Sequence, residues 1–437
     1  MYLKGSKWSM NRRRKRPNWF RIILLSLLVL AGAYVNRFII PNQPQIGVPT
    51  PTVTRSPESF VTEAQEYFAQ GKLFPAIESY KQAIASSPQD PSIYVALART
   101  QVFAGQYKEA QESAESAILL NNNNSNAYAV LAWSLDFQGE TIQAEDNIKR
   151  ALELDPNNAL AHAYYSEILV DSFYGGTSIV GAIEKAIEES KVAIALAPDT
   201  LETHRARGYV LEATGNYDEA IREYEAAVAV NANIADLHLS LGRNYRIIGG
   251  YDKAILAFTR ANALNPEDPT PDLFISRTYA TIGEYAKAMQ YAESAVTDNP
   301  GDASLRGNLG VMYYRNAYWT ESITELGYVV NGGVTEEGDK IEPITLVPND
   351  SRTAEYYSTY GLALSRLNEC GKALQVARTL LERVPADEVA VENANAIIDR
   401  CQQSLDAPPE PTGTPLATDP ASTEIPAAEE TPTPATP

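Results

Sequence analysis

A period of 34 residues runs through the chain from residue 57 to residue 387. Within the segment Gly71–Pro88, the glycine is followed by Ala76, Tyr80 and Ala83, and residues of the same kind return 34 positions later. Each unit has room for two helical stretches, separated by a turn at the glycine and ended by the proline. One helix pair cannot bury its apolar face alone, so neighbouring units must stack into a continuous core. The later members of the series are Gly105, Ala110 and Ala117; Gly139, Ala144, Ala151 and Pro156; after eight extra residues Gly181, Ala186, Ala193 and Pro198; Gly215, Ala220, Tyr224 and Ala227; Gly249, Ala254, Phe258, Ala261 and Pro266; and Gly283, Ala288, Ala295 and Pro300.

These positions resemble a tetratricopeptide repeat, with a small residue at position 8, an aromatic one at 11, glycine at 15, alanine at 20 and 27, and proline at 32. Nine copies fill residues 57–387, and the copies at 303–336 and 354–387 are the weaker ones. The resemblance implies an all-α, right-handed superhelical solenoid of about nine helix-turn-helix units. Residues 388–405 resemble the helix that caps such arrays.

Two inserts interrupt the period. The first, near 171–178, lengthens the turn between the two helices of the fourth repeat. The second, near 337–353, follows the eighth repeat, and the alternation within 331–353 predicts a small hairpin. Inserts in repeat arrays often lie on a binding edge, but tolerated surface loops explain both inserts equally well.

The N-terminus combines a basic cluster at 12–16 with an apolar stretch at 19–40. Its 22 residues would form a helix of about 33 Å, long enough to cross a bilayer. Because the basic cluster lies wholly on the N-terminal side of this stretch, the sequence predicts a single-pass anchor in the cytoplasmic membrane, with the N-terminus inside and the repeats outside. The alternative is a signal peptide cleaved near Ala33, which would release a secreted protein.

The remaining segments frame the array. The predicted divisions are a basic segment 1–18, a transmembrane signal-anchor helix 19–40, a Pro-rich linker 41–56, the array 57–387, a capping helix 388–405, and an acidic Pro/Thr/Ala-rich tail 406–437. The compositions of the linker and the tail predict extended, disordered segments.

Charge and motif content argue against most enzymatic and nucleic-acid functions. The chain has a net charge of −19, and residues 58–437, with 26 Lys/Arg and 55 Asp/Glu, carry −29. Binding to a phosphate backbone requires clustered positive charge, so no nucleic-acid partner is expected. The sequence contains no phosphate-binding glycine loop, no zinc-protease motif, no C-x-x-C and no G-x-S-x-G. We therefore expect no catalytic residues, no cofactor and no metal.

The few histidines and cysteines have structural explanations. His162, His204 and His238 all fall at position 4 of successive repeats, about 8–10 Å apart in such an array and too far apart to share a metal. Cys370 begins the second helix of the ninth repeat, and Cys401 lies near the end of the capping helix. Since successive helices of this architecture run antiparallel, the two cysteines form either a disulfide in an oxidising compartment or two buried thiols.

The resemblance places positions 2, 5, 9, 12 and 13 of each repeat along an inner groove. Arginines and aromatic residues recur there, which favours a groove for a peptide segment with acidic residues or a free carboxyl terminus. The alternative is that Glu167, Glu212 and Asp236 neutralise these arginines within the solenoid. The predicted groove residues are Arg99, Phe103, Trp133, Phe137, Arg205, Tyr209, Arg243, Arg246, Arg277, Tyr314 and Arg315.

Together these features predict a non-enzymatic scaffold or adaptor that binds a protein or peptide partner at the cell envelope. An assembly or secretion chaperone for exported clients is a second hypothesis. A cell-wall or carbohydrate-binding protein is a third, because Trp133 and Tyr209 could stack on sugars.

Overall fold

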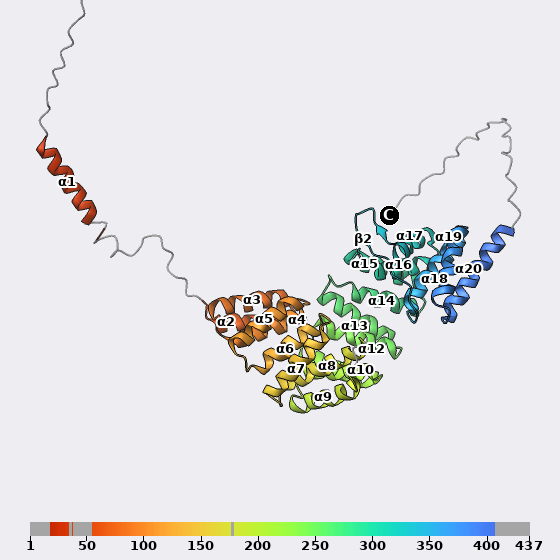
Figure 1. Cartoon of the computed structure of the whole chain (residues 1–437), viewed down its shortest axis with the longest axis horizontal. Coiled ribbons are helices and arrows are strands. Elements are labelled where there is room, and N and C mark those ends of the chain that lie inside the picture. Colours follow the sequence, from red (N-terminus) through yellow and green to blue (C-terminus); the bar gives the residue numbers. More distant parts are fainter. Residues whose placement is uncertain (1–17, 35–36, 38–54, 176–178, 407–437) are drawn as a thin grey trace, which may run out of the picture. The chain divides into compact units, whose positions relative to one another are not determined.

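The computed structural model describes residues 18–34, 37, 55–175 and 179–406 (Figure 1). These residues form twenty α-helices, α1–α20, and one two-stranded hairpin. The chain separates into two units, residues 1–56 and residues 57–437.

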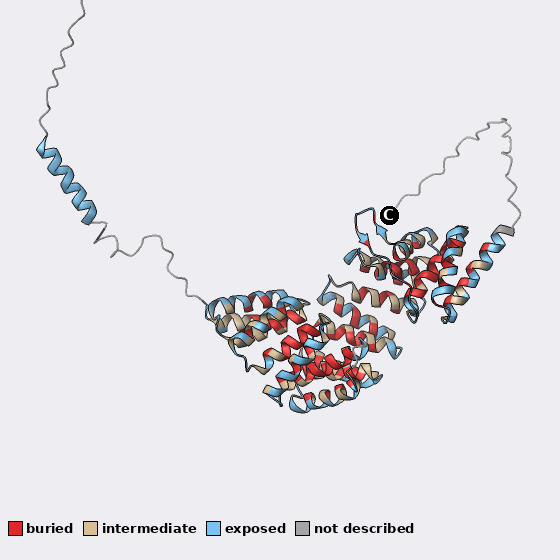
Figure 2. Cartoon of the chain, viewed as in Figure 1, coloured by how far each residue is buried: buried red, intermediate tan, exposed pale blue. Residues whose placement is uncertain are grey.

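The first unit contains one described helix, α1 (Trp19–Tyr34), which has 16 residues and is exposed along its length (Figure 2). The sequence predicted a longer transmembrane helix, from residue 19 to residue 40. Within the part of the chain that the structure describes, no helix combines the length and apolar character that a bilayer span needs. The structure therefore does not support the predicted transmembrane helix. Most of the predicted basic segment, linker and tail lies outside the described residues.

The second unit is a succession of nine helix pairs followed by one final helix. In each pair the first and second helices contact each other, and each pair packs on the next in chain order. The final helix, α20 (Glu388–Asp406), packs on both helices of the ninth pair. The pairs are α2 (Pro57–Ala69) with α3 (Leu73–Ser86), α4 (Pro91–Phe103) with α5 (Tyr107–Leu120), α6 (Ser125–Asp136) with α7 (Thr141–Leu154), α8 (Ala159–Tyr174) with α9 (Ala182–Leu196), α10 (Leu201–Ala213) with α11 (Tyr217–Val230), α12 (Ala235–Ile247) with α13 (Tyr251–Leu264), α14 (Thr270–Thr281) with α15 (Tyr285–Asp298), α16 (Ala303–Arg315) with α17 (Trp319–Asn331), and α18 (Ser351–Arg366) with α19 (Cys370–Arg383).

Local sequence sets where the first helices begin. A side-chain oxygen of an Asp or Asn accepts a hydrogen bond from a backbone N–H of the first turn, which satisfies a donor that has no partner within the helix. Five of the first helices begin in this way, at Asp90, Asn124, Asn158, Asp302 and Asp350.

The turn between the two helices of each repeat requires a left-handed backbone. In the first seven repeats a glycine takes this position, with φ between +70° and +82°. In the last two repeats Ala317 (φ 66°) and Asn368 (φ 59°) occupy the same position. The glycine signal is therefore missing from these two repeats, although the turn itself is kept.

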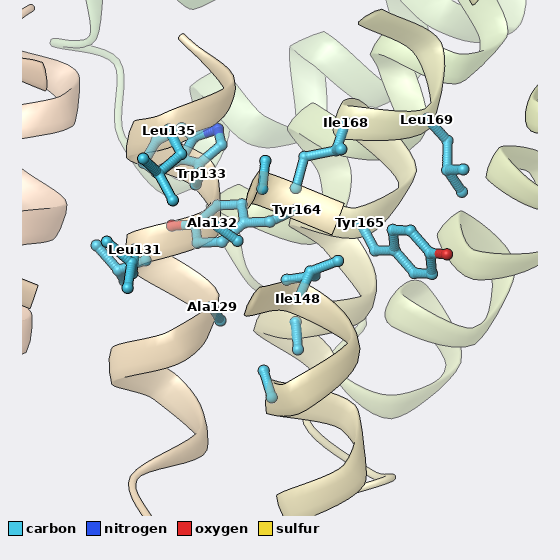
Figure 3. Close-up of a cluster of buried hydrophobic side chains, with 14 of the residues drawn as sticks. Ala129, Leu131, Ala132, Trp133, Leu135, Ile148, Tyr164, Tyr165, Ile168 and Leu169 are labelled. Carbon is cyan, nitrogen blue, oxygen red and sulfur yellow. The ribbon is translucent and has the colours of Figure 1, made fainter. Parts of the chain in front are cut away.

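The core follows the small residues of the period. Ala76, Ala83 and their counterparts in the next repeats are fully buried. Larger side chains fill the space beside them: Trp133 of α6 stacks on Tyr164 of α8 with ring centroids 4.2 Å apart, close to Ile168 (Figure 3). The all-α array predicted from the period is thus present.

The second insert forms the predicted hairpin and joins the core. Strands β1 (Gly333–Val334) and β2 (Lys340–Ile341) pair antiparallel, with Gly333 opposite Ile341. The segment that follows is fixed on both sides, because Ile344 donates its N–H to the Val329 carbonyl (2.8 Å) and accepts from the Tyr357 hydroxyl (2.9 Å). This insert is therefore packed against α17 and α18. At the first insert α8 extends to Tyr174, and residues 176–178 lie outside the described part.

A disulfide joins the final helix to the array. Cys370, the first residue of α19, is bonded to Cys401 of α20, and their Cα atoms are 5.4 Å apart. Cys401 is fully buried. The bond fixes the end of α20 to the start of α19, as the antiparallel arrangement of successive helices requires.

Candidate functional site

The first helices of the repeats line one surface of the array, which we call the inner face. Each of the eleven residues predicted for the groove lines at least one of five pockets on this face. The pockets differ in one respect that matters for binding: in some the charged side chains already have partners within the array, and in others they do not.

Within α2–α13, repeats that are far apart in the sequence contact each other. Arg99 of α4 forms an ion pair with Glu202 of α10, which is 103 residues further along the chain. The side-chain amides of Asn231 and Asn233 donate hydrogen bonds to the carbonyls of Phe68 (3.3 Å) and Ala69 (2.9 Å). The end of α2 thus contacts the loop between α11 and α12. We call α2–α13 the closed segment.

At the centre of the closed segment, Arg205 of α10 has two acidic partners. Its Nη1 lies 2.5 Å from Glu167 Oε2, and its Nε lies 2.9 Å from Asp236 Oδ2. The same Glu167 oxygen accepts a hydrogen bond from Trp133 Nε1 (2.8 Å). Trp133 is only 1% exposed. Arg205 and Trp133 therefore hold the array together, and Trp133 offers no surface for stacking on a sugar.

A cluster of buried carboxyl groups lies beside this arginine. Tyr209 donates a hydrogen bond to Asp171, and Asp171 lies next to Asp136. Burial, together with the neighbouring Asp171, raises the pKa of Asp136 from 3.8 to about 9. Burial also raises the pKa of Glu167 to about 7, against the opposing effect of Arg205. These groups line a pocket of about 430 Å³.

Arg243 of α12 is also paired. Its Nε lies 3.1 Å from Glu212 Oε1, and Asn244 and Tyr224 donate hydrogen bonds to Glu212 Oε2 (2.9 and 3.0 Å). Four predicted groove residues, Arg99, Arg205, Tyr209 and Arg243, are thus bonded to acids of the array itself. The internal ion pairs that the sequence analysis gave as the alternative to a peptide groove are therefore present in the closed segment.

The closed segment nevertheless keeps an aromatic pocket of about 420 Å³. One wall contains Phe103, Tyr107 and Phe137, and the Tyr107 and Phe137 rings are stacked with centroids 4.8 Å apart. Other lining residues come from α12, α13 and the loops beside them, and include Ile234, Leu239 and Leu264. Two aromatic side chains at this pocket are open to solvent, Phe74 (61% exposed) and Phe137 (41%). We call this the aromatic pocket.

Among the described residues, three other arginines of the inner face form no ion pair: Arg246 at the end of the closed segment, and Arg277 and Arg315 in the repeats that follow. Arg246 of α12, Arg277 of α14 and Arg315 of α16 line a pocket of about 210 Å³ together with Arg352 of α18. Arg315 also lines a larger pocket of about 640 Å³, shared with Tyr314, α18 and α20. Tyr314 packs edge-on against Trp319 (4.9 Å), and its hydroxyl accepts a hydrogen bond from Arg366.

The histidines contact neighbouring protein groups. His162 and His204 each place Nδ1 next to a glutamate of the following helix, Glu189 and Glu223. His238 bonds the Ala232 carbonyl (2.9 Å). Among the described residues, no group of three or more His, Cys, Asp or Glu side chains could hold a metal ion.

Sequence reasoning missed several residues of the inner face. Phe68, Asp171 and Glu202 occupy positions 12, 13 and 2 of their repeats, so the position rule that selected the arginines could have found them. Arg352 lies in the second insert, outside the repeat frame, and Tyr107 belongs to a second helix. No positional signal identifies these two.

Three tetratricopeptide repeat family models match parts of the array, over residues 67–133, 125–158 and 205–269. Together with the nine helix pairs, they support tetratricopeptide repeats as the building unit of this all-helical solenoid. Proteins built from this repeat generally act as non-enzymatic scaffolds for protein–protein interaction. No curated protein matches the chain.

Three solved structures resemble parts of the array. PilF of Pseudomonas aeruginosa is 20% identical and covers 48% of this chain and 91% of its own, with a TM-score of 0.41. PilW, described as a widely conserved type IV pilus biogenesis factor, is 20% identical and covers 47% and 91%, with a TM-score of 0.42. A tetratricopeptide repeat protein of Parabacteroides merdae is 16% identical and covers 59% and 98%, with a TM-score of 0.38. Likeness at this level assigns no function to this chain.

Proposed function

We propose that the array is a non-enzymatic scaffold that binds a peptide segment of a protein partner on its inner face. One observation carries the proposal: the closed segment, in which Arg99, Arg205 and Arg243 are paired internally, leaves open a pocket lined by aromatic rings. Exposed aromatic side chains at the rim of a pocket are typical of sites where apolar side chains of a partner are buried.

The geometry favours a peptide segment over a compact ligand. Phe74 belongs to the first repeat and Leu264 to the sixth, so an occupant would contact several repeats at once. The aromatic pocket adjoins a second pocket of the closed segment, because Phe137, Arg205 and Asp236 line both. An extended segment can follow such a surface with one side chain in the aromatic pocket, and partner binding would then require no change of the fold.

The extracytoplasmic location predicted from the sequence is also a proposal. The Cys370–Cys401 disulfide supports it, because such bonds persist in oxidising compartments and are rare in the reducing cytosol. Attachment to the membrane through residues 19–40 rests on the sequence alone. Alkylation of cells before lysis, with and without reductant, would test the compartment: only the reduced sample should gain two labelled cysteines. Labelling without reductant would contradict the proposed location.

The binding proposal is tested by capture from the native cell with the full chain as bait. The variant Phe74→Glu/Phe137→Glu changes two exposed side chains, so it is expected to fold, which circular dichroism would check. The matched control Leu119→Glu alters an apolar side chain of α5 that is 87% exposed and lines none of these pockets. We expect a stoichiometric partner that the control retains and the double variant loses. Equal capture by both baits would contradict binding in the aromatic pocket.

A further inference from the structure

Four arginines from four successive first helices converge on one pocket, which we call the arginine pocket. Arg246 comes from α12, Arg277 from α14, Arg315 from α16 and Arg352 from α18. The pocket has a volume of about 210 Å³. It extends from α12, at the end of the closed segment, into the repeats that follow, and it shares no lining residue with the aromatic pocket.

The charge of this pocket is not balanced. Its one acidic lining residue, Glu355, is engaged by Arg352, whose Nη1 lies 2.7 Å from Glu355 Oε2. The Nε atoms of Arg246 and Arg277 are buried and have no hydrogen-bond partner within the described part of the chain. A buried donor without an acceptor is unfavourable, and a bound acceptor would remove that penalty.

The arginines of the pocket lie close enough together that neighbouring positive charge lowers the pKa of two of them. Burial lowers the pKa of Arg246, and the neighbouring Arg277 and Arg352 lower it further. Burial and Arg352 lower the pKa of Arg277 in the same way. On the rest of the inner face the array supplies acids to Arg99, Arg205 and Arg243. In a body of net charge −29, four arginines that share one acid are therefore a local exception.

The shape of the site favours an extended anion over a compact one. Arg315, Arg352 and Glu355 also line the adjoining pocket of about 640 Å³, which reaches α20. The two pockets therefore adjoin, and the excess positive charge lies in the arginine pocket, because the adjoining pocket balances its two arginines with Glu355 and Asp387. Guanidinium groups bind carboxylates through two parallel hydrogen bonds, and several groups in a row suit several carboxylates in a row.

We infer that the arginine pocket binds consecutive acidic side chains of a peptide. This inference names a second subsite for the segment invoked in the proposed function, and rests on that function. The same chemistry occurs within this chain after residue 406, where five Asp/Glu and no Lys/Arg are present. The carboxylates can therefore come from a partner or from the protein's own tail.

The test measures binding of a fluorescein-labelled hexaglutamate peptide to the full chain, with a hexaglutamine peptide for comparison. The variant Arg246→Gln/Arg277→Gln removes two charges and leaves no acid of the array without its partner, so it should fold. The control Arg222→Gln/Arg150→Gln removes the same charge from exposed ion pairs on second helices. We expect the pocket variant to weaken hexaglutamate binding at least tenfold, and the control to weaken it less than twofold.

A chain ending at residue 406 distinguishes the two sources of carboxylate. Tighter binding of hexaglutamate by this shorter chain would identify the tail as a competing occupant, and equal binding would point to a partner. Equal affinity of the pocket variant and the control, or equal binding of hexaglutamine, would overturn the subsite. If inorganic phosphate displaced the labelled peptide as well as unlabelled hexaglutamate does, the site would bind a compact ion, and the peptide proposal would be wrong. None of these results changes what the Phe74/Phe137 variant tests, so the two proposals can fail separately.

Discussion

Arg99 and Glu202 form an ion pair that joins the second repeat to the fifth, across 103 residues of sequence. The second and fifth repeats are not neighbours, so the regular stacking of adjacent repeats does not explain this contact. The pair exists because the curvature accumulated over the intervening helices brings α4 and α10 together, and it closes the segment that contains the aromatic pocket.

The first prediction concerns this closure. Glu202→Gln leaves the partly buried Arg99 without an acid, so the free energy of unfolding should fall by about 1–3 kcal/mol. Hydrogen exchange should quicken in α2–α4 and α10, and remain unchanged in α16–α20. As a control, Arg150→Gln removes an exposed pair with Glu153 and should change stability by less than about 0.5 kcal/mol. Equal effects of the two variants would show that the closure adds nothing.

The second prediction concerns pH. In the unfolded chain Asp136 ionises near its ordinary pKa of 3.8, whereas in the folded protein it stays protonated up to about pH 9. The unfolded state therefore binds fewer protons between these values, and stability should fall as the pH rises from 4 to 9. Glu167, with a pKa of about 7, acts in the same direction.

The variant Asp136→Asn removes one of these two ionisations. Denaturation at pH 5 and pH 8 should show a smaller loss of stability for Asp136→Asn than for the unaltered protein. An unchanged loss would mean that Asp136 is ionised in the fold.

The third prediction concerns helix packing. A Cβ atom at Gly242 of α12 would lie 2.3 Å from the Phe258 ring, whereas one at Gly327 of α17 would have no neighbour within 3.7 Å. Alanine favours a helix over glycine by about 1 kcal/mol. Gly327→Ala should therefore stabilise the protein, and Gly242→Ala should destabilise it by about 1–3 kcal/mol through overpacking. Thermal unfolding of the two variants should shift in opposite directions, and shifts of the same sign would refute the packing argument.

The fourth prediction concerns the disulfide. The bond closes a loop between residues 31 positions apart, for which chain entropy predicts about 3–4 kcal/mol of stabilisation. Because α20 packs only on the two helices of the ninth pair among the helix contacts of this end of the array, the loss in Cys370→Ser/Cys401→Ser should be local. Hydrogen exchange should quicken in α19 and α20 and stay unchanged in the closed segment. Loss of protection throughout the array would contradict a local role.

The repeat period predicted most of the fold because the determinants are local. A small residue, a turn residue and a helix-ending residue define each helix pair, and neighbouring pairs stack in chain order. The weaker eighth and ninth repeats differ because Ala317 and Asn368 take the left-handed position in place of glycine. For the predicted span 19–40, the structure describes α1 over Trp19–Tyr34, and most of residues 35–40 lie outside the described part.

The inner face was only partly predictable. The acids Glu167, Glu212 and Asp236 at the groove positions predicted internal ion pairs as the alternative to a peptide groove, and these pairs are present in the closed segment. Asp171 and Glu202 occupy the same kind of position and were not counted. The contact between Arg99 and Glu202 depends on the curvature accumulated over several repeats. The position of Arg352 depends on the packing of the second insert. The repeat pattern predicts neither.

The most direct test of the inner face as a binding surface is site-specific photo-crosslinking in the native cell. A benzophenone amino acid would replace Phe137 in the aromatic pocket or, in a matched chain, Leu119 on α5. We predict one discrete crosslinked partner from position 137, absent from position 119 and mapped by mass spectrometry to a single peptide segment. Crosslinking of the same partner from position 119 alone, or from both positions equally, would contradict recognition on the inner face.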